Sequence, residues 1–475
     1  MPSAKSIIPK RINVLERVSA YGKILRSGLL LTALCGSAGA FSQDNSPYSR
    51  FGLGDLVPQT NINMRGMGGV AAAYVDPYGT SINFTNPATY GSFFALKTPN
   101  SRTIDQGRAI LDIGLNFENR TLQEPNTVTK FRASNALFSH VQVGVPLKPN
   151  WGLSFGLRPM TRVSYKQINS FRSPIDSTVD LNQGDGGSYL GSIGTGAKFK
   201  LNNTNRISIG ANGGYLFGKR ENSRRRSLYN DSISYTSSNY ESNLSYGGIY
   251  FNMGLQYEIT LNTKKQIYLT LGAFGNIKQT IRASNDDIIE TYYYDETVGY
   301  PRIDSVSDHL NQKGDIEWPS SITGGLMLEK RFNGLKEASW KIGVDVSQSN
   351  WSEYRSYGLA DANVTDKWEV KVGGEISPIP NKNYFSRVSY RAGVNFGPDY
   401  LRIVGRELPL FGATLGLGLP VGNFSAQGRT QATFVNLAFE YLRRGNNDSP
   451  LKDNMFRVSV GFSLSDIWFV KRKYE

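Results

Sequence analysis

Few residues in the chain could support nucleophilic or acid–base chemistry. The two histidines, His140 and His309, follow Ser139 and Asp308 in the sequence. A serine nucleophile needs a histidine base and a carboxylate held in one hydrogen-bonded line. Nothing in the spacing of these residues fixes such a line, so we expect no enzyme activity.

A second group of interest consists of charged residues in the last third of the chain. Its members are Glu369, Lys371, Glu375, Arg387 and Arg391. Carboxylates beside basic groups could form an acid–base cluster, but a network of ion pairs in a polar interior is the simpler interpretation. We therefore expect a structural polar network here.

Metal and phosphate sites are disfavoured by spacing. Asp286, Asp287 and Asp304 offer hard oxygen ligands, but no calcium-binding spacing with a turn glycine accompanies them. The glycine-rich residues 65–73 lack the GxxxxGK[ST] spacing of a phosphate-binding loop. Cys35 is the single cysteine and lies in a segment that we expect to be removed. We expect no metal and no cofactor.

The N-terminus predicts export. Six basic side chains precede the apolar run 28–36, and Ala38-Gly39-Ala40 follows it. This run is too short to span a bilayer as a helix, and the small residues fit a signal-peptidase site. We therefore expect residues 1–40 to be a signal peptide. After removal of residues 1–40, basic side chains still outnumber acidic ones, and this excess would suit binding to lipopolysaccharide phosphates or to neighbouring proteins. Export from the cytoplasm disfavours nucleic acid as a partner.

The elements that must position these groups are β-strands. In residues 250–261 apolar side chains alternate with polar ones, so Phe251 and Met253 would face one way and Asn252 and Gln256 the other. A soluble β-sandwich also alternates. The mean hydropathy of −0.35 also fits a membrane barrel, because its strands place half of their side chains in a polar lumen.

The spacing of about fourteen strand candidates favours the barrel. Short turns follow the even-numbered strands, and long polar stretches, such as 221–243 and 284–318, follow the odd-numbered ones. Bacterial barrels have short periplasmic turns and long outer loops. We therefore expect an all-β protein whose transmembrane antiparallel barrel covers residues 107–470. Both termini would be periplasmic, with a basic tail at 471–475.

Residues 41–106 do not alternate and are too long for a simple leader. They combine small residues, turn residues and local apolar content, which predicts a compact plug, or hatch, inside the barrel. The residues to which we assign hatch structure and gating are Arg65, Gly66, Gly68, Gly69, Asp76, Asn86, Pro87 and Ala88.

Several stretches resemble the FadL/TodX family of outer-membrane transporters, including its relatives in Bacteroidetes. Asn86-Pro87-Ala88 is similar to the motif that closes that family's hatch, and residues 151–159 and 318–324 match other parts. The resemblance implies a fourteen-stranded barrel from which ligands escape sideways through a kinked third strand. Arg158 and Pro159 interrupt that strand here, and proline donates no ladder N–H. We expect the wall opening at these two residues.

The resemblance implies passive movement of hydrophobic small molecules, such as long-chain fatty acids, across the outer membrane. Expected partners are outer-membrane lipid, lipopolysaccharide and the ligand. An alternative is an accessory barrel of the type IX protein secretion system, which would bind secretion proteins or plug a translocon. Long polar loops and net positive charge would suit this alternative.

Overall fold

The computed structural model describes residues 46–76, 79–96, 104, 106–125, 127–172, 176–230, 232–332, 337–421 and 431–468. The expected signal peptide and the basic tail lie outside the described residues.

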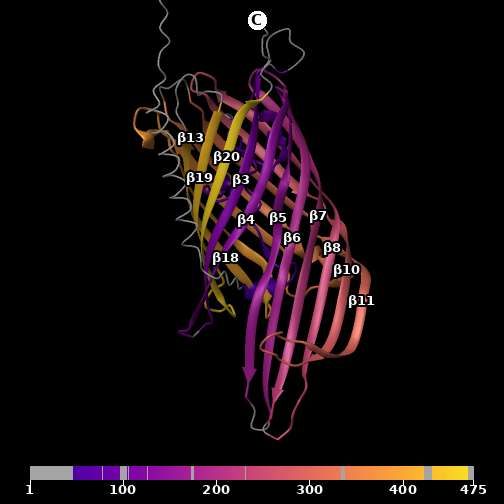
Figure 1. The fold of residues 1–475 in the computed structure, drawn as a ribbon. Helices are drawn as coiled ribbons and strands as arrows, with labels where there is room; N and C mark the ends of the chain where they lie inside the picture. Colours follow the sequence, from indigo (N-terminus) through magenta and orange to yellow (C-terminus); the bar gives the residue numbers. More distant parts are fainter. Residues whose placement is uncertain are drawn as a thin grey trace, which may run out of the picture. The chain divides into compact units, whose positions relative to one another are not determined.

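A single antiparallel sheet closes on itself, because the last strand pairs with the first strand of the wall. Within the described residues the wall has fourteen strands (Figure 1), which confirms the predicted fold class. The strands that run uninterrupted are β3 (Gln106–Gln123), β4 (Lys130–Lys148), β5 (Trp151–Phe171), β6 (Ser177–Lys200), β7 (Asn205–Tyr229), β8 (Ser237–Asn262), β16 (Lys367–Ser377), β17 (Ser389–Ile403), β18 (Arg406–Val421), β19 (Gln431–Arg444) and β20 (Lys452–Trp468).

The remaining wall strands are each built from two pieces. The pieces are β9 (Ile267–Asn276) with β10 (Gln279–Tyr292), β11 (Arg302–Trp318) with β12 (Ser321–Lys330), and β13 (Ser339–Ser349) with β14 (Arg355–Ser356). The short β15 (Leu359–Ala360) pairs with β14. Closure pairs the two ends of the sheet, which would otherwise expose two full edges of unpaired backbone groups.

The two faces of the wall differ as the alternation predicts. Phe251 and Met253 are 50% and 67% exposed on the outer face, whereas Asn252 and Gln256 are buried. An apolar outer face around a polar interior is typical of a barrel that meets lipid. No helix among the described residues is long and apolar enough to cross a membrane.

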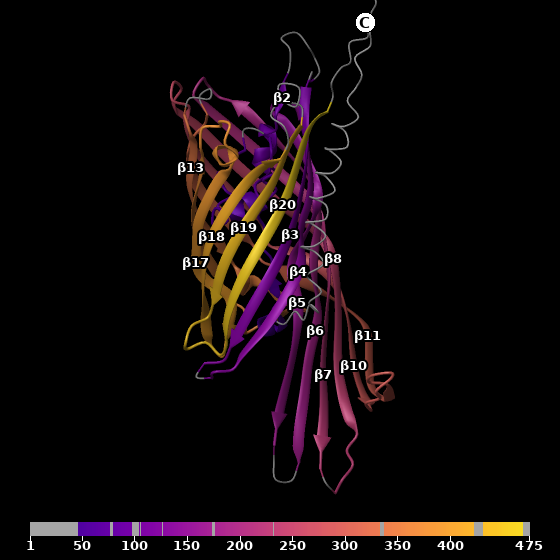
Figure 2. The same ribbon diagram turned by 60° about the vertical axis from the view of Figure 1, so that its left-hand side comes forward.

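The two stretches predicted as long polar loops are mostly strand. Most of 221–243 belongs to β7 and β8, and most of 284–318 to β10 and β11. Figures 1 and 2 show these strands continuing beyond the ends of their neighbours. Arg224 and Arg226 pair with Asp180 on the adjacent β6. Cross-strand charge pairs of this kind stabilise a polar strand without any apolar alternation in the sequence.

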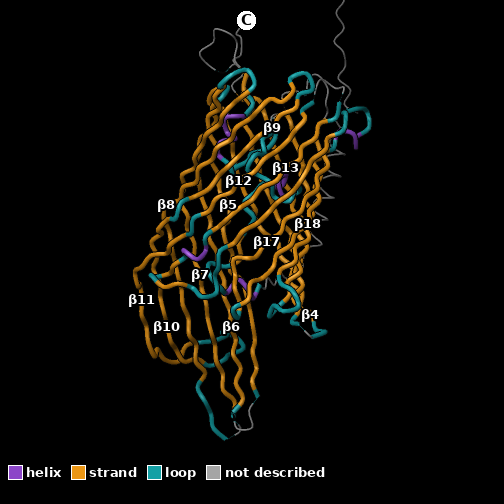
Figure 3. Tube along the Cα trace, turned by 180° about the vertical axis from the view of Figure 1, so that it is seen from behind, coloured by secondary structure: helices purple, strands orange, loops and turns teal. Residues whose placement is uncertain are grey.

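The described residues before β3, 46–76 and 79–96, lie within the barrel, where they cross between opposite walls (Figure 3). We call residues 46–76 and 79–96 the luminal segment. Its elements are η1 (Pro47–Arg50), β1 (Asp55–Leu56), α2 (Ile62–Arg65), η2 (Pro87–Ser92) and β2 (Ala95–Leu96). The α2 turn packs against β18 to β20, and η2 packs against β4 to β8. Most residues from Thr60 to Gly91 are buried.

Candidate functional site

A cavity of about 320 Å³ lies between the luminal segment and the barrel wall. One side of its lining is aromatic and includes Tyr250, Trp318 and Trp351. The Tyr250 and Trp318 rings meet edge to face with their centroids 6.3 Å apart, and Trp318 and Trp351 are 6.1 Å apart. This side offers a desolvated contact surface for an apolar ligand.

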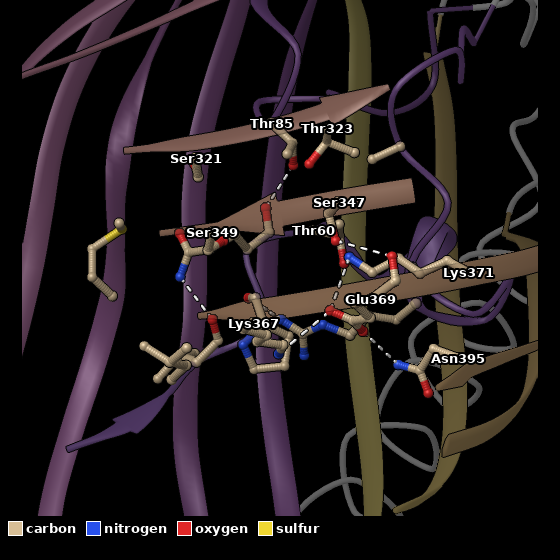
Figure 4. A pocket seen from close by; sticks show the side chains of 18 of the residues that line it. Thr60, Thr85, Ser321, Thr323, Ser347, Ser349, Lys367, Glu369, Lys371 and Asn395 are labelled. Carbon is tan, nitrogen blue, oxygen red and sulfur yellow. Dashed lines mark hydrogen bonds and ion pairs between the residues drawn. The ribbon is translucent and has the colours of Figure 1, made fainter. Parts of the chain in front are cut away.

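Another part of the cavity lining is charged (Figure 4). Glu369 lies between two lysines, with Lys367 Nζ at 3.4 Å and Lys371 Nζ at 3.7 Å from its carboxylate. Asn395 donates a further hydrogen bond to Glu369 (3.2 Å). Two lysines around one carboxylate leave a net positive charge, so the cavity combines an apolar side with a cationic one.

The five residues of the predicted polar network lie in three places, the first being the cavity with Glu369 and Lys371. Arg391 donates to Glu375 (2.6 Å), whose other oxygen lies 4.0 Å from Lys341 Nζ, and all three side chains are nearly buried. Arg387 lies elsewhere, in the 3-10 turn η4 (Tyr384–Arg387), and donates to the backbone carbonyls of Asn381 and Lys382 just before that turn. The strand begins only at Ser389, so Arg387 is not brought into the lumen.

Arg65 ties the luminal segment to the wall. Its guanidinium donates to Asn116 of β3 (2.6 Å), to Ser139 of β4 (2.8 Å) and to Ser459 of β20 (3.3 Å). Burial lowers the pKa of Arg65 to about 10, and the charge of Glu440 opposes this effect. Arg65 therefore remains cationic at neutral pH and bridges three strands at the barrel seam.

The predicted glycines allow the backbone of the luminal segment to touch the wall. Gly68 has φ +70°, and a Cβ there would lie 2.8 Å from Val394 O and 2.9 Å from Val372 O. Its N–H donates to Thr414 Oγ1 (2.8 Å). Gly66 ends α2 so close to Gly416 that a Cβ would meet its Cα at 2.9 Å. Gly69 also has a positive φ, +84°.

Asn86, Pro87 and Ala88 form the start of η2. Asn86 is completely buried, accepts from Ala88 N–H (3.1 Å) and donates to Ala72 O (2.7 Å). Proline at the first helical position costs no hydrogen bond. Asp76 accepts hydrogen bonds from the backbone N–H and the hydroxyl of Thr80 in a local turn.

Asp55 was not singled out from the sequence, yet it is the most heavily paired acidic residue of the luminal segment. Its carboxylate contacts Arg444 of β19 (2.8 Å) and Arg120 of β3 (3.1 Å) and accepts from Ser46 (2.5 Å). Burial alone would raise the pKa of Asp55, but the charges of Arg444 and Arg120 outweigh burial and hold it well below its usual range. Only tertiary contacts reveal this role, because the partners are distant in sequence.

The wall is interrupted beside Pro159, near the predicted opening. The ladder between β4 and β5 ends at the pair Val141 and Leu157. Beyond it β5 remains bonded to β6, with a register shift after Pro159. The free edge of β5 is met from inside by β1, where Leu56 lies opposite Thr161.

A cavity of about 390 Å³ adjoins this interruption. Leu137 and Phe138 of β4 line one side, and Pro159 of β5 lines another. Arg158 points away from it into the interior, where its guanidinium lies 5.1 Å from the Phe84 ring centre. The two predicted wall residues therefore face different spaces.

Ser139, His140 and Asp112 contact one another in the sequence serine–histidine–carboxylate of a hydrolytic triad, but they are buried. Ser139 Oγ lies 3.1 Å from His140 Nδ1, and His140 Nε2 lies 3.4 Å from Asp112. All three side chains are almost completely buried, and Ser139 already accepts a hydrogen bond from Arg65. We interpret them as packing groups. Among the described residues no cluster of three or more potential metal ligands occurs.

Solved structures share the barrel architecture at low sequence identity. The toluene transporter TodX of Pseudomonas putida has a TM-score of 0.50 and 14% identity, covering 87% of this chain and 99% of that one. The CymD monoaromatic hydrocarbon channel has a TM-score of 0.48 and 13% identity, covering 88% of this chain and 100% of that one. A FadL homologue of Pseudomonas aeruginosa has a TM-score of 0.47 and 14% identity, covering 88% of this chain and 99% of that one. At this identity the likeness to TodX concerns the fold alone.

Sequence comparison assigns the family. No curated protein matches the chain. The family model that matches is BamG, over residues 24–475, and not the FadL/TodX model that the sequence motifs resemble. The match extends over nearly the whole chain, so the chain belongs to the BamG family.

Proposed function

We propose that this protein is an outer-membrane channel for hydrophobic small molecules, which move passively past the luminal segment. The apolar outer face supports a membrane location, and the expected signal peptide at 1–40 supports export. In this arrangement residues 41–106 act as the hatch, and both termini are periplasmic. The shared fold with TodX, named a toluene transporter, agrees with this proposal.

The observation that carries the proposal is the interruption of the wall at Pro159. A barrel that only held partners would gain nothing from a broken ladder, because unpaired backbone groups in lipid cost several kcal/mol each. Here the β4–β5 ladder stops at Val141 and Leu157, and a cavity of about 390 Å³ lies beside the interruption. A molecule leaving the lumen at this point would enter the bilayer directly.

The luminal cavity supports an amphipathic ligand. The aromatic rings of the lining would hold an alkyl chain, and Lys367 and Lys371 would attract a carboxylate. Long-chain fatty acids have both parts. Gly66 and Gly68 would let the luminal segment shift against the wall, because they lie against wall backbone and have no side chains to displace. Gly69 lies near the flexible Lys371 side chain, which could move with it.

A reversible disulfide tests the route. The sequence after residue 40 contains no cysteine, so the pair Leu56→Cys and Thr161→Cys would staple β1 across the β5 edge. Directly opposed strand residues suit disulfide geometry. Uptake of a labelled long-chain fatty acid into proteoliposomes should fall about tenfold when the staple is oxidised and recover on reduction.

The matched control is a staple within the intact wall, Leu437→Cys with Val460→Cys, which are opposed on β19 and β20. It should leave uptake unchanged. Equal uptake through the oxidised L56C/T161C protein would overturn the proposed route.

A second candidate function is a partner-binding barrel. Membership of the BamG family supports a role in protein assembly at the outer membrane, and the type IX secretion alternative belongs to the same class of function. The polar β7–β8 and β10–β11 hairpins, with Arg224 and Arg226, offer a surface for protein partners. Gentle purification followed by mass spectrometry separates the candidates. Stoichiometric bound lipid without protein supports the channel, whereas a stable protein partner with an empty barrel supports the second role.

A further inference from the structure

Three neighbouring wall strands are broken at one level, away from the β4–β5 interruption. The breaks lie between β9 and β10, between β11 and β12, and between β13 and β14. They are level because Asn276 lies opposite Ser321, and Gln279 lies opposite Trp318. β8 pairs with β10 along its first half and with β9 along its second half. The wall therefore has a second position at which the ladder of backbone hydrogen bonds is interrupted.

Side chains replace the missing ladder bonds at this level. Gln279 accepts from the Phe251 N–H (2.7 Å) and donates to the Phe251 carbonyl (3.2 Å). Glu353 accepts from both the backbone N–H and the hydroxyl of Ser320 (3.1 and 2.9 Å). These bonds satisfy backbone groups that would otherwise be unpaired in lipid. A side-chain bond can open and re-form without any change of strand register.

An apolar groove of about 1090 Å³ lies on the outer face of the broken strands. Its walls include Met253, Ile277 and Ile322, which are 67%, 75% and 63% exposed. Lys278 lies on its lining and pairs with Glu317 (2.7 Å) while keeping 44% of its side chain exposed. The groove is therefore mostly apolar, with one half-exposed lysine, paired to Glu317, on its lining.

The outer groove and the luminal cavity share part of their lining. The shared residues are Asn252, Phe274, Gly275, Asn276, Ser320 and Ser321. Most of them are small or polar, and Gly275 brings its backbone against the Ser321 carbonyl without a side chain between. One layer of chain therefore separates lipid from the aromatic side of the cavity, where Tyr250 and Trp318 lie.

We propose that the outer groove binds the alkyl chain of a long-chain fatty acid from the bilayer, with its carboxylate near Lys278, and that the broken strands form a second lateral doorway into the luminal cavity. The groove lies on the lipid-facing side of the wall and is mostly apolar, as an alkyl chain requires. The side-chain hydrogen bonds at the strand breaks can open and re-form. This inference rests on the proposed channel function and adds a route distinct from the interruption at Pro159.

The test uses a diazirine-bearing long-chain fatty acid with the full protein in lipid nanodiscs. Ala273 lines the groove on the outer face, so Ala273→Phe fills it with a side chain that lipid tolerates. Ala413→Phe is the matched control, because Ala413 lies between the exposed Phe411 and Leu415 on β18. Photolysis and peptide mapping then locate adducts on the outer side, at Met253, and on the luminal side, at Trp318.

Wild-type protein should give adducts at both places. A273F should reduce both by about fivefold, and A413F should reduce neither. Retained heat-modifiable migration of both variants shows that the barrels are folded. A diazirine-labelled phospholipid should label the groove less than the fatty acid does.

Each other outcome overturns the doorway in a distinguishable way. Luminal adducts that A273F leaves unchanged mean entry elsewhere, which contradicts the doorway but not the channel. Absence of luminal adducts in every variant contradicts both. Outer adducts that are insensitive to A273F mean ordinary surrounding lipid, and stronger labelling by phospholipid means that the groove is a structural lipid site.

Discussion

Asp55 connects the luminal segment to two arginines that are more than 300 residues apart in the chain, Arg120 and Arg444. Removing one partner of a buried ion pair leaves a buried charge without compensation. The pairing therefore matters more for the position of the segment than a surface pair of the same geometry would. Lys219 and Glu221 form such a surface pair, at 2.8 Å.

Replacing Asp55 by Asn should loosen the luminal segment. The free energy of its local opening should fall by about 1–2 kcal/mol, because the segment loses its ion pairs to Arg120 and Arg444. The two arginines keep their other carboxylate partners, Asp453 and Asp399, so neither charge is left uncompensated. Hydrogen exchange of residues 46–60 measures this opening. Glu221→Gln is the control and should leave exchange unchanged. Equal protection in D55N and wild type would refute the anchoring role.

The same carboxylate predicts a pH dependence. The arginine charges depress the folded pKa of Asp55 below its value in the unfolded chain. Its stabilising contribution is therefore complete above the unfolded pKa of about 3.9 and is lost only as the pH falls towards the folded value. Protection of residues 46–60 should persist at pH 5 and decline below about pH 4. D55N should lack this Asp55-dependent decline.

Gly68 allows a test of close packing at a single atom. Gly68→Ala would place a Cβ against two carbonyl oxygens of the wall and keep an unfavourable positive φ, costing about 2–3 kcal/mol. Gly405 has a similar φ of +73° but open space around it, so Gly405→Ala isolates the backbone cost alone, about 1 kcal/mol. Urea unfolding of the two variants gives the difference. Equal effects would show that contact with the wall is unimportant.

At the scale of elements, the strand breaks depend on a few side chains. Gln279→Ala would leave the Phe251 N–H and carbonyl without partners and should destabilise the barrel by about 2–4 kcal/mol. Gln312→Ala, at an exposed site on β11, should have little effect. The temperature at which each barrel loses heat-modifiable migration reports the change. A normal Q279A transition would mean that water or lipid headgroups satisfy these groups.

The elements that the sequence predicts well are those with an apolar outer face. In β8, Phe251 and Met253 alternate with buried polar residues, and the expected faces are found. The predicted loop 284–318 is instead two strands, β10 and β11. Between residues 284 and 315 most side chains of these strands are polar, and apolar ones such as Ile289 and Leu310 do not follow a regular alternation, so hydropathy contains little signal. Pairing with β8 and with each other determines their conformation.

The predicted site depends in the same way on tertiary contacts. Glu375 and Arg391 form the expected pair, because β16 and β17 bring them opposite each other. Arg387 is only four residues away in sequence but lies in a turn, since the strand begins after it. Asp55 could not have been chosen from its neighbours in the chain. Its partners are supplied by strands at the two ends of the barrel sequence.

At the scale of the whole molecule, the long hairpins and the closed wall should be separable. Asn222 and Ser242 are opposed on β7 and β8, so deleting residues 223–241 with a short turn in their place would remove the hairpin tip. We expect the shortened barrel to stay folded and to take up fatty acid normally. Loss of a co-purifying protein partner with retained uptake would assign partner binding to the hairpin. Loss of both would show that the tip supports the barrel itself.

The closed wall also constrains the order in which the chain can fold. Tyr48 donates to the carbonyl of Leu451, 403 residues away, and β3 pairs with β20 at the far end of the chain. Contacts of such sequence separation form slowly, because a long loop must close first. The luminal segment contacts β4 to β8 on one side and β18 to β20 on the other. We therefore infer that the wall forms around a segment already in place, and that the pairing of β20 with β3 encloses the segment as it completes the barrel.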